Sequence, residues 1–205
     1  MIPEKTIERL SRYRRILAGL RREGEVFVYS HRLATLAGLT AAQVRRDLMA
    51  TGYSGSPSKG YNVNDLMESV GGLLDGPTTQ GVALVGVGNL GRAILAYFIG
   101  RRPKLIIAAA FDKDPHIAGR VICGCRCYDM NEMDDVFREK DICVGIVAVP
   151  AANAQAVAVR MVQAGACGIL NFAPTALHLP ANVHVENLDM AVALEKVAYF
   201  ARQGR

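Results

Sequence analysis

The chain has 205 residues, of which 51% are hydrophobic, and a formal net charge of +5. This length and apolar content allow one or two domains with real cores and exclude a disordered chain. No stretch reaches the roughly 20 uncharged apolar residues that a membrane-spanning helix needs, and the charged N-terminus does not resemble a signal peptide. Five cysteines, an odd number, favour a reducing compartment over a disulfide framework. We therefore expect a soluble cytoplasmic protein without a membrane partner.

The positive charge is concentrated in the first third of the chain. Residues 1–60 hold 11 Lys and Arg against 5 Asp and Glu, whereas residues 61–205 hold 13 against 14. A solvated helix face would also explain a basic N-terminus. A basic module joined to a nearly neutral one is typical of a protein that binds nucleic acid and has a second function.

The N-terminal third predicts a helix-turn-helix. Apolar residues at helical spacing predict a helix over about 4–22. Ser30 is expected to cap a short helix that stops at Gly38, and Thr40 to cap a third helix over 41–50. In this motif the second helix of the pair carries the groove-reading side chains. The polar and basic candidates on it are Gln43, Arg45, Arg46 and Asp47.

A candidate wing follows the third helix. Residues 53–61 indicate a turn between short strands, and Lys59, Gly60 and Tyr61 are further candidate DNA contacts. A linking helix is expected over 65–74, and the Gly76-Pro77 pair predicts a domain boundary. We expect a winged-helix domain over residues 1–78.

Beyond residue 79 the pattern changes to apolar runs that alternate with helical segments. Such runs suit parallel strands buried on both faces, and their order predicts an α/β, doubly wound parallel sheet. The expected strands cover 82–85, 105–111, 142–149, 168–172 and 183–187. The expected helices cover 90–100, 132–139 and 152–165. This domain is expected over 79–187, with a C-terminal helical segment over 188–205.

A glycine motif, 86–91 (GVGNLG), directly follows the first of these strands and opens a helix. Its glycines allow a tight turn, close approach of a pyrophosphate to the backbone, and close packing of helix on strand. Asp112 ends the next strand, where an acid bonds the ribose hydroxyls of NAD(H) in preference to NADP(H). The motif therefore predicts a Rossmann domain that binds NAD(H). The expected cofactor contacts are Gly86, Val87, Gly88, Asn89, Leu90, Gly91, Asp112, Lys113, Val149 and Pro150.

Two other chemistries are alternatives to this interpretation. A small NAD-dependent oxidoreductase with a basic dimerisation module is possible, but no clear acid/base residue stands out among His31, His116, His178 and His184. Three cysteines at 123, 125 and 127 would lie on one face of a strand. Their spacing lacks the usual zinc pattern, so we expect no metal. Cys143 and Cys167 are expected in the core. We expect no catalytic residues and no enzyme.

Several motifs together resemble the Rex family of redox-sensing transcriptional repressors. They extend over nearly the whole chain: 12–15 (RYRR), 43–48 (QVRRDL), 60–63 (GYNV), 86–91 (GVGNLG), 111–115 (FDKDP), 165–174 (GACGILNFAP) and 186–189 (ENLD). One departure is the wing, where Lys59 is the sole positive charge of residues 54–59 and family wings are more basic.

The resemblance implies a homodimer that binds palindromic, double-stranded operator DNA and senses the ratio of NADH to NAD+. In such proteins the C-terminal helix, here 190–202, is exchanged between subunits, and NADH closes the dimer and releases the DNA. The resemblance also assigns an interdomain polar switch to Arg15, Tyr97 and Asp189.

Overall fold

The computed structural model describes residues 2–100 and 104–203. These residues form two compact units, Met1–Thr78 and Thr79–Arg205, and the division falls one residue after the Gly76-Pro77 pair. The expected α/β fold class is confirmed. The second unit contains the parallel sheet and the first is a small helical domain with a two-stranded ribbon.

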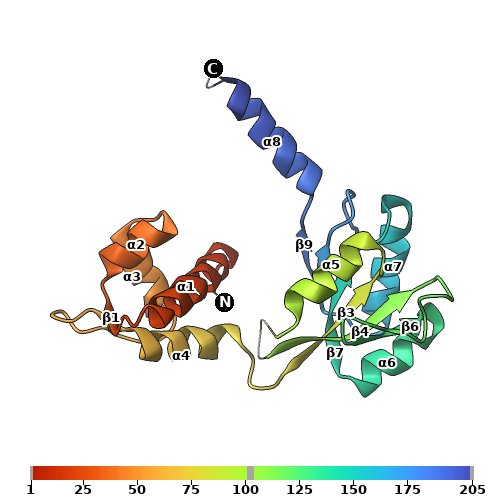
Figure 1. The fold of residues 1–205 in the computed structure, drawn as a ribbon, viewed down its shortest axis with the longest axis horizontal. Coiled ribbons are helices and arrows are strands. Elements are labelled where there is room, and N and C mark those ends of the chain that lie inside the picture. Colours follow the sequence, from red (N-terminus) through yellow and green to blue (C-terminus); the bar gives the residue numbers. More distant parts are fainter. Residues whose placement is uncertain (1, 101–103, 204–205) are drawn as a thin grey trace. The chain divides into compact units, whose positions relative to one another are not determined.

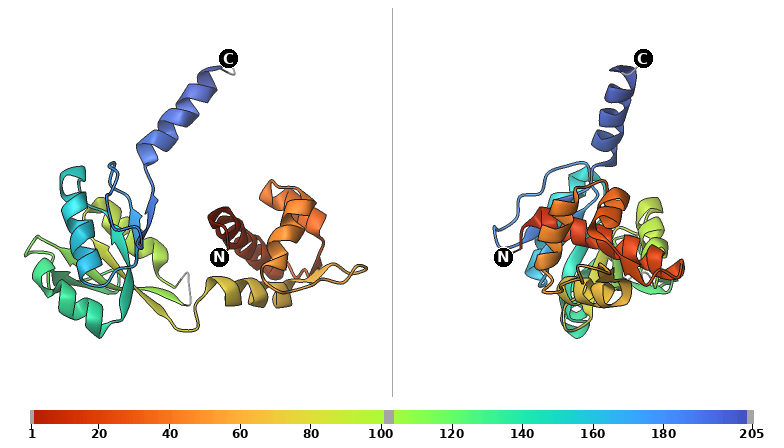
Figure 2. Two further views of the ribbon diagram at one scale, coloured as in Figure 1. Left: turned by 180° about the vertical axis from the view of Figure 1, so that it is seen from behind. Right: turned by 90° about the vertical axis from the view of Figure 1, so that its left-hand side faces the viewer.

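The first unit is built around one apolar core. Leu10, Tyr13 and Leu17 of the first helix are fully buried, and they pack with Leu48 and Leu66 from later helices. The helices of this unit surround the core (Figure 2). The elements are α1 (Glu4–Arg22), β1 (Phe27–Val28), α2 (Ser30–Ala37), α3 (Ala41–Met49), β2 (Tyr61–Asn62) and α4 (Val63–Leu74).

The ends of α2 and α3 follow from local chemistry. Gly38 ends α2 in the left-handed region with φ 66°, where a side chain would be strained. Thr40 caps α3 as expected, because its hydroxyl accepts the N–H of Gln43 at 3.2 Å. The prediction that Ser30 caps α2 is wrong. Tyr29 is the extended cap residue and Ser30 is the first helical residue; its hydroxyl accepts from Arg45 instead.

The wing is a loop closed by a short antiparallel ribbon. Strand β1 pairs with β2 in the register Val28 to Tyr61, and the backbones of Ser56 and Gly60 exchange two hydrogen bonds of 2.7 Å. A side chain at Gly60 would meet the Val28 carbonyl at 2.6 Å, and its φ is +78°. Glycine is therefore required where the loop closes.

The second unit contains a seven-stranded sheet (Figure 1). The strand order is β5-β6-β4-β3-β7-β8-β9, and all pairs are parallel except β5 with β6. From β6 to β9 this is the doubly wound Rossmann order. The strands are β3 (Gln80–Val85), β4 (Leu105–Asp112), β5 (Val121–Ile122), β6 (Cys125–Asp129), β7 (Ile142–Val147), β8 (Gly168–Asn171) and β9 (His184–Asn187). The helices are α5 (Asn89–Phe98), η1 (Met130–Glu132), α6 (Met133–Glu139), α7 (Ala151–Gln163) and α8 (Met190–Gln203).

Helices cover both faces of the sheet, as the continuous apolar strands predict. On β3, Val82 and Leu84 pack with α5, whereas Ala83 and Val85 pack with α6 and α7. This alternation follows from the two-residue period of a strand. Helix α5 therefore lies on one face of the sheet, with α6 and α7 on the other.

Helix α8 differs from the other α-helices because none of residues 190–203 is buried. Its large apolar side chains are between 52% and 69% exposed. They are Met190, Val192, Leu194, Val197, Tyr199 and Phe200. A contiguous apolar surface of this kind is typical of a helix that packs on another chain.

The expected grouping of three cysteines on one strand is wrong. Cys123 lies in the β5–β6 turn with φ 49°, where it is exposed, whereas Cys125 and Cys127 are buried on β6. Burial raises the pKa of Cys125 and of Cys127 to about 11, so both thiols stay protonated near neutral pH. The expectation that Cys167 lies in the core is also wrong, because this residue is exposed just before β8.

Candidate cofactor cleft and DNA-recognition surface

The glycine turn between β3 and α5 shows why each of its glycines is needed. At Gly86 φ is +97°, and a side chain would overlap the Ala148 carbonyl. A side chain at Gly91 would overlap the carbonyl of Gly86, so helix and strand approach closely there. At Gly88 an added Cβ would meet no atom of the described residues within 4 Å. Open space beside a helix N-terminus leaves room for a pyrophosphate.

Asp112, at the end of β4, is bonded to this turn. Its Oδ2 accepts the backbone N–H of Val87 at 2.7 Å, and its Oδ1 accepts that of Asp114 at 3.0 Å. A carboxylate offers about four acceptor positions, so two remain for the hydroxyls of a ribose. Asp112 therefore both braces the turn and can hold the nucleotide.

A cleft of about 290 Å³ opens at the carboxyl ends of β3, β4 and β7. Strand β3 is the point where the strand order reverses, which is where doubly wound folds bind nucleotides. The cleft gathers five of the expected contacts, and its other described lining residues are chiefly apolar. The expected residues on it are Gly86, Asp112, Lys113, Val149 and Pro150. Sequence patterns missed Met130 and Asn153, which also line the cleft, since neither belongs to a motif.

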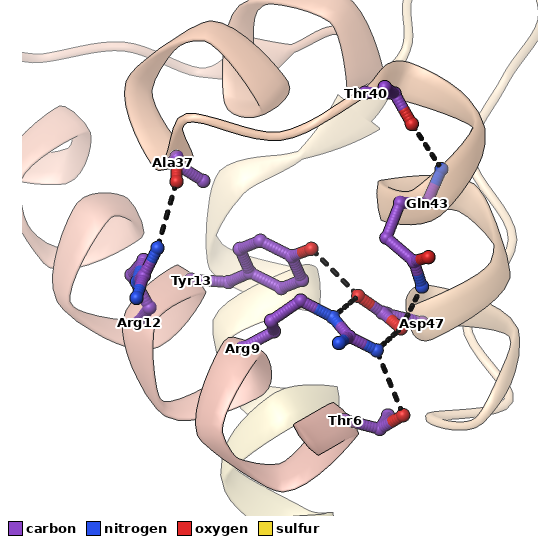
Figure 3. Close-up of polar contacts among 8 residues, drawn as sticks. All are labelled: Thr6, Arg9, Arg12, Tyr13, Ala37, Thr40, Gln43 and Asp47. Atoms are coloured by element: carbon purple, nitrogen blue, oxygen red, sulfur yellow. Dashed lines mark hydrogen bonds and ion pairs between the residues drawn. The ribbon is translucent and has the colours of Figure 1, made fainter.

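Helix α3 is bonded to α1 by a partly buried group that we call the Asp47 cluster, consisting of Arg9, Tyr13, Gln43 and Asp47 (Figure 3). Arg9 binds the Asp47 carboxylate through Nε at 2.6 Å and Nη2 at 2.7 Å. The Tyr13 hydroxyl donates to Asp47 Oδ2, and Gln43 Nε2 donates to Oδ1, both at 2.8 Å. Asp47 is only 2% exposed, so the expectation that its side chain faces a groove is wrong.

The charge state of Asp47 follows from these bonds. Burial alone would raise the pKa of its carboxyl, but the hydrogen bonds from Arg9, Tyr13 and Gln43 outweigh burial and lower it. Burial and the Asp47 carboxylate raise the pKa of Tyr13. Asp47 is therefore an anion and Tyr13 a neutral donor at neutral pH. Sequence spacing could not reveal Arg9 and Tyr13, which lie 38 and 34 residues away from Asp47.

The outer side of α3 exposes its basic residues. Arg45 and Arg46 are exposed, and Arg45 Nη1 contacts the Ser30 hydroxyl at 3.2 Å. On the wing, exposed Lys59 lies 5.9 Å from the Phe27 ring centre. Tyr61 is half-buried and Gly60 is buried at the loop closure. Among these candidates, Arg45, Arg46 and Lys59 are the side chains available to phosphates.

The three residues that the family resemblance assigns to a switch lie on different elements. Arg15 is exposed on α1, and Tyr97 is 54% exposed on α5, beside Phe98. Asp189 caps α8, because its Oδ1 accepts the N–H groups of Ala191 at 2.9 Å and Val192 at 3.1 Å. Both of these hydrogen bonds go to Oδ1, so the Asp189 carboxylate keeps acceptor positions for another partner.

A buried amide links the end of β8 to the segment before α8. Asn171 Nδ2 donates to Asn187 Oδ1 at 2.8 Å, and the Asn171 carbonyl accepts the N–H of Leu188, also at 2.8 Å. Asn171 is fully buried. These bonds fix the position from which Asp189 and α8 begin.

The fold and the two sites define a class of protein in which a winged helix is joined to a Rossmann domain with a dinucleotide-binding turn. Residues 1–48 match the family described as a putative DNA-binding protein N-terminus, and residues 78–175 match the CoA binding domain family. The redox-sensing transcriptional repressor Rex of Carboxydothermus hydrogenoformans is 42% identical over 202 residues, which cover 98% of this chain and 97% of the relative. The chain belongs to the Rex family of redox-sensing transcriptional repressors.

Solved structures of a Rex-family repressor called RSP agree with this assignment. The structure of RSP in complex with beta-NAD+ and operator DNA has a TM-score of 0.90 and 32% identity, and covers 100% of this chain and 94% of that one. The complex of RSP with beta-NADH has a TM-score of 0.86 and 31% identity, and covers 100% and 96%.

Proposed function

We propose that this protein is a transcriptional repressor that binds operator DNA and responds to the ratio of NADH to NAD+. The observation that carries the proposal is the combination, in one chain, of the cleft at Asp112 with the basic outer side of α3. Relatives named as redox-sensing repressors, and the RSP complexes with either dinucleotide, support it. The winged helix takes the DNA and the cleft takes NAD(H).

The cleft supports a binding role rather than catalysis. Among its described lining residues, Asp112 and Lys113 are the ionisable side chains, and Asp112 is already bonded to the turn. A dehydrogenase needs a free acid/base group near the reacting carbon, and among the described lining residues only Lys113 is left for that role. NAD(H) supplies a ring that is cationic when oxidised and neutral when reduced, and the protein reads this difference. Steady consumption of NADH with any carbonyl substrate, at enzyme-like rates, would contradict this role.

A homodimer through α8 is part of the proposal. The large apolar side chains of α8 are exposed in the single chain. A second copy of the chain supplies an apolar surface that can cover them. Two chains present two α3 helices, which suits a palindromic operator. Arg15, Tyr97 and Asp189 are the candidates that couple dinucleotide binding to DNA affinity.

The test is a titration on DNA. A duplex pool with randomised half-sites is bound to the protein, and the enriched sequence is labelled for fluorescence anisotropy. At fixed excess NAD+, added NADH is expected to release the DNA without being oxidised. The reason is that a ligand changes DNA affinity only by binding one conformation of the protein more tightly than the other, and such binding does not consume the ligand. Replacing Arg45 and Arg46 by Ala is expected to weaken DNA binding and flatten the salt dependence by about one unit per phosphate contact, with NADH affinity unchanged.

The switch is tested with Asp189→Asn, which removes the charge while an amide oxygen still caps α8. We expect this variant to fold normally and to release DNA equally with either dinucleotide. Glu195→Gln, on the same helix, serves as the charge-matched control. A variant that discriminates NADH from NAD+ as sharply as the wild type would place the switch elsewhere.

A further inference from the structure

We propose that Asp47 sets the orientation of the Gln43 side-chain amide before DNA is bound, and that Gln43, held in this way, reads an adenine in the major groove. This inference rests on the proposed DNA-binding function and adds a base-specific contact and its positioning residue. It starts from the Asp47 cluster (Figure 3).

The chemistry of Asp47 decides which way the amide faces. An ionised carboxylate only accepts hydrogen bonds, so it attracts the Nε2 group of Gln43 and repels Oε1. The bond from Nε2 to Asp47 Oδ1 is 2.8 Å long and uses one of the two Nε2 hydrogens. The second N–H of Gln43 and its Oε1 remain, and they form one donor beside one acceptor.

That remaining pair matches adenine. In the major groove adenine presents N7 as an acceptor and N6 as a donor, whereas guanine presents two acceptors. Gln43 therefore satisfies both groups of adenine and only one group of guanine. Arg45 and Arg46 carry only donors, so neither can recognise adenine in the same way.

The position of Gln43 on α3 suits base contact. It is the third helical residue, and its backbone N–H is capped by Thr40. In helix-turn-helix proteins the N-terminal residues of this helix meet the base edges. Thr40 and Gln43 also have the spacing of a capping box, in which the Gln side chain turns back to the cap residue. Here the side chain is bonded to Asp47 instead.

Asp47 does not read a base itself. It is 2% exposed, and its two oxygens accept four hydrogen bonds, from Arg9, Tyr13 and Gln43. Its effect on the DNA passes through Gln43. A side chain that is already ordered loses less conformational freedom on binding, so this arrangement also strengthens the contact.

The experiment uses the full chain and the duplex enriched from the randomised pool. Each A·T pair of a half-site is exchanged for G·C or given 7-deazaadenine, which lacks N7, and affinities are compared for the wild type, Gln43→Ala, Asp47→Asn and the double variant. The wild type is expected to prefer adenine at one position by about tenfold, the size of one good bidentate contact. Gln43→Ala is expected to remove that preference.

The double variant separates positioning from mere stability. When Gln43 is present, Asp47→Asn is expected to weaken the preference for adenine. When Gln43 is already replaced by Ala, Asp47→Asn is expected to leave the base preference unchanged. Tyr13→Phe, which removes a bond to the same carboxylate without touching Gln43, is expected to keep the preference. If Asp47→Asn lowers affinity for every duplex equally and keeps the preference, the positioning role is overturned.

A second measurement needs no variant at Asp47, whose replacement could unfold the domain. In the DNA-free wild type, NMR spectra are expected to show one Gln43 side-chain amide proton exchanging slowly with solvent. Equally fast solvent exchange of both Nε2 protons would overturn the inference. An enriched sequence with no position that depends on Gln43 would also overturn it. Failure to enrich any sequence would instead contradict the proposed DNA binding.

Discussion

Asp47 shows how one buried carboxylate can make the stability of a domain depend on pH. Its pKa is lower in the folded protein than the ordinary 3.8, so its contribution to stability is fully present above about pH 4 and is lost as the pH falls through the lowered value. We expect the free energy of unfolding in urea to fall below about pH 4 in the wild type.

The variant Asp47→Asn provides the comparison for this pH dependence. It is expected to be less stable at neutral pH, because Arg9 loses an ionised partner, and to show a flatter decline in acid. Circular dichroism during urea titrations at several pH values measures both effects. Parallel pH profiles for the variant and the wild type would mean that another carboxylate is responsible.

Asp112 is the residue that we propose as the ribose contact of the cleft. Asp112→Ala removes the acceptor of the Val87 N–H and of a bound ribose, and charge-assisted hydrogen bonds contribute on the order of 1.5–3 kcal/mol. We expect calorimetry to show at least tenfold weaker binding of both NADH and NAD+. Asp114→Ala is the matched control, since Asp114 does not line the cleft; unchanged affinity in Asp112→Ala would remove Asp112 from the site.

At the scale of elements, the turn between β3 and α5 offers two glycines with opposite roles. Gly88→Ala adds a methyl group to open space, so we expect unchanged thermal stability and at least tenfold weaker NADH binding where the phosphate approaches. Gly91→Ala forces a methyl group onto the Gly86 carbonyl, so we expect a clearly lower Tm. Thermal melts with and without NADH distinguish the two, and a destabilised Gly88→Ala would contradict this division.

Periodicity predicted most of these elements because their faces are consistently buried. Strands β3, β4, β7 and β8 consist largely of apolar residues and glycine, and the helices between them repeat at helical spacing. The β5–β6 turn was missed because Cys-x-Cys-x-Cys alternates as a strand does, while Cys123 in fact has a positive φ. The role of Asp47 was missed for another reason: its partners on α1 are distant in sequence, and a carboxylate on a basic helix has no local sign of burial.

At the scale of the whole molecule, the proposed dimer depends on α8. Leu194 and Val197 are 69% and 64% exposed on this helix, and replacing both by Glu places charges where an apolar partner is expected. Sedimentation equilibrium should give a dimer for the wild type and a monomer for the double variant. DNA affinity should fall by at least about tenfold, because the two half-sites are no longer bound together.

The control for this prediction is Glu195→Gln, on the same helix. It is expected to leave the dimer intact, since Glu195 is a polar residue between the two apolar ones. A double variant that still sediments as a dimer, with unchanged DNA affinity, would show that the chains associate through another surface. The helical content of the double variant, measured by circular dichroism, verifies that α8 itself is retained.

The exposed apolar side of α8 also has a genetic consequence. A chain with Arg45 and Arg46 replaced keeps α8 intact, so in a cell that makes both forms we expect it to join wild-type chains through this helix as readily as they join one another. Most assembled molecules would then carry at least one defective DNA-binding half, and the mutant allele would be dominant over the normal gene. Loss of α8 removes the means of joining, and such an allele would be recessive.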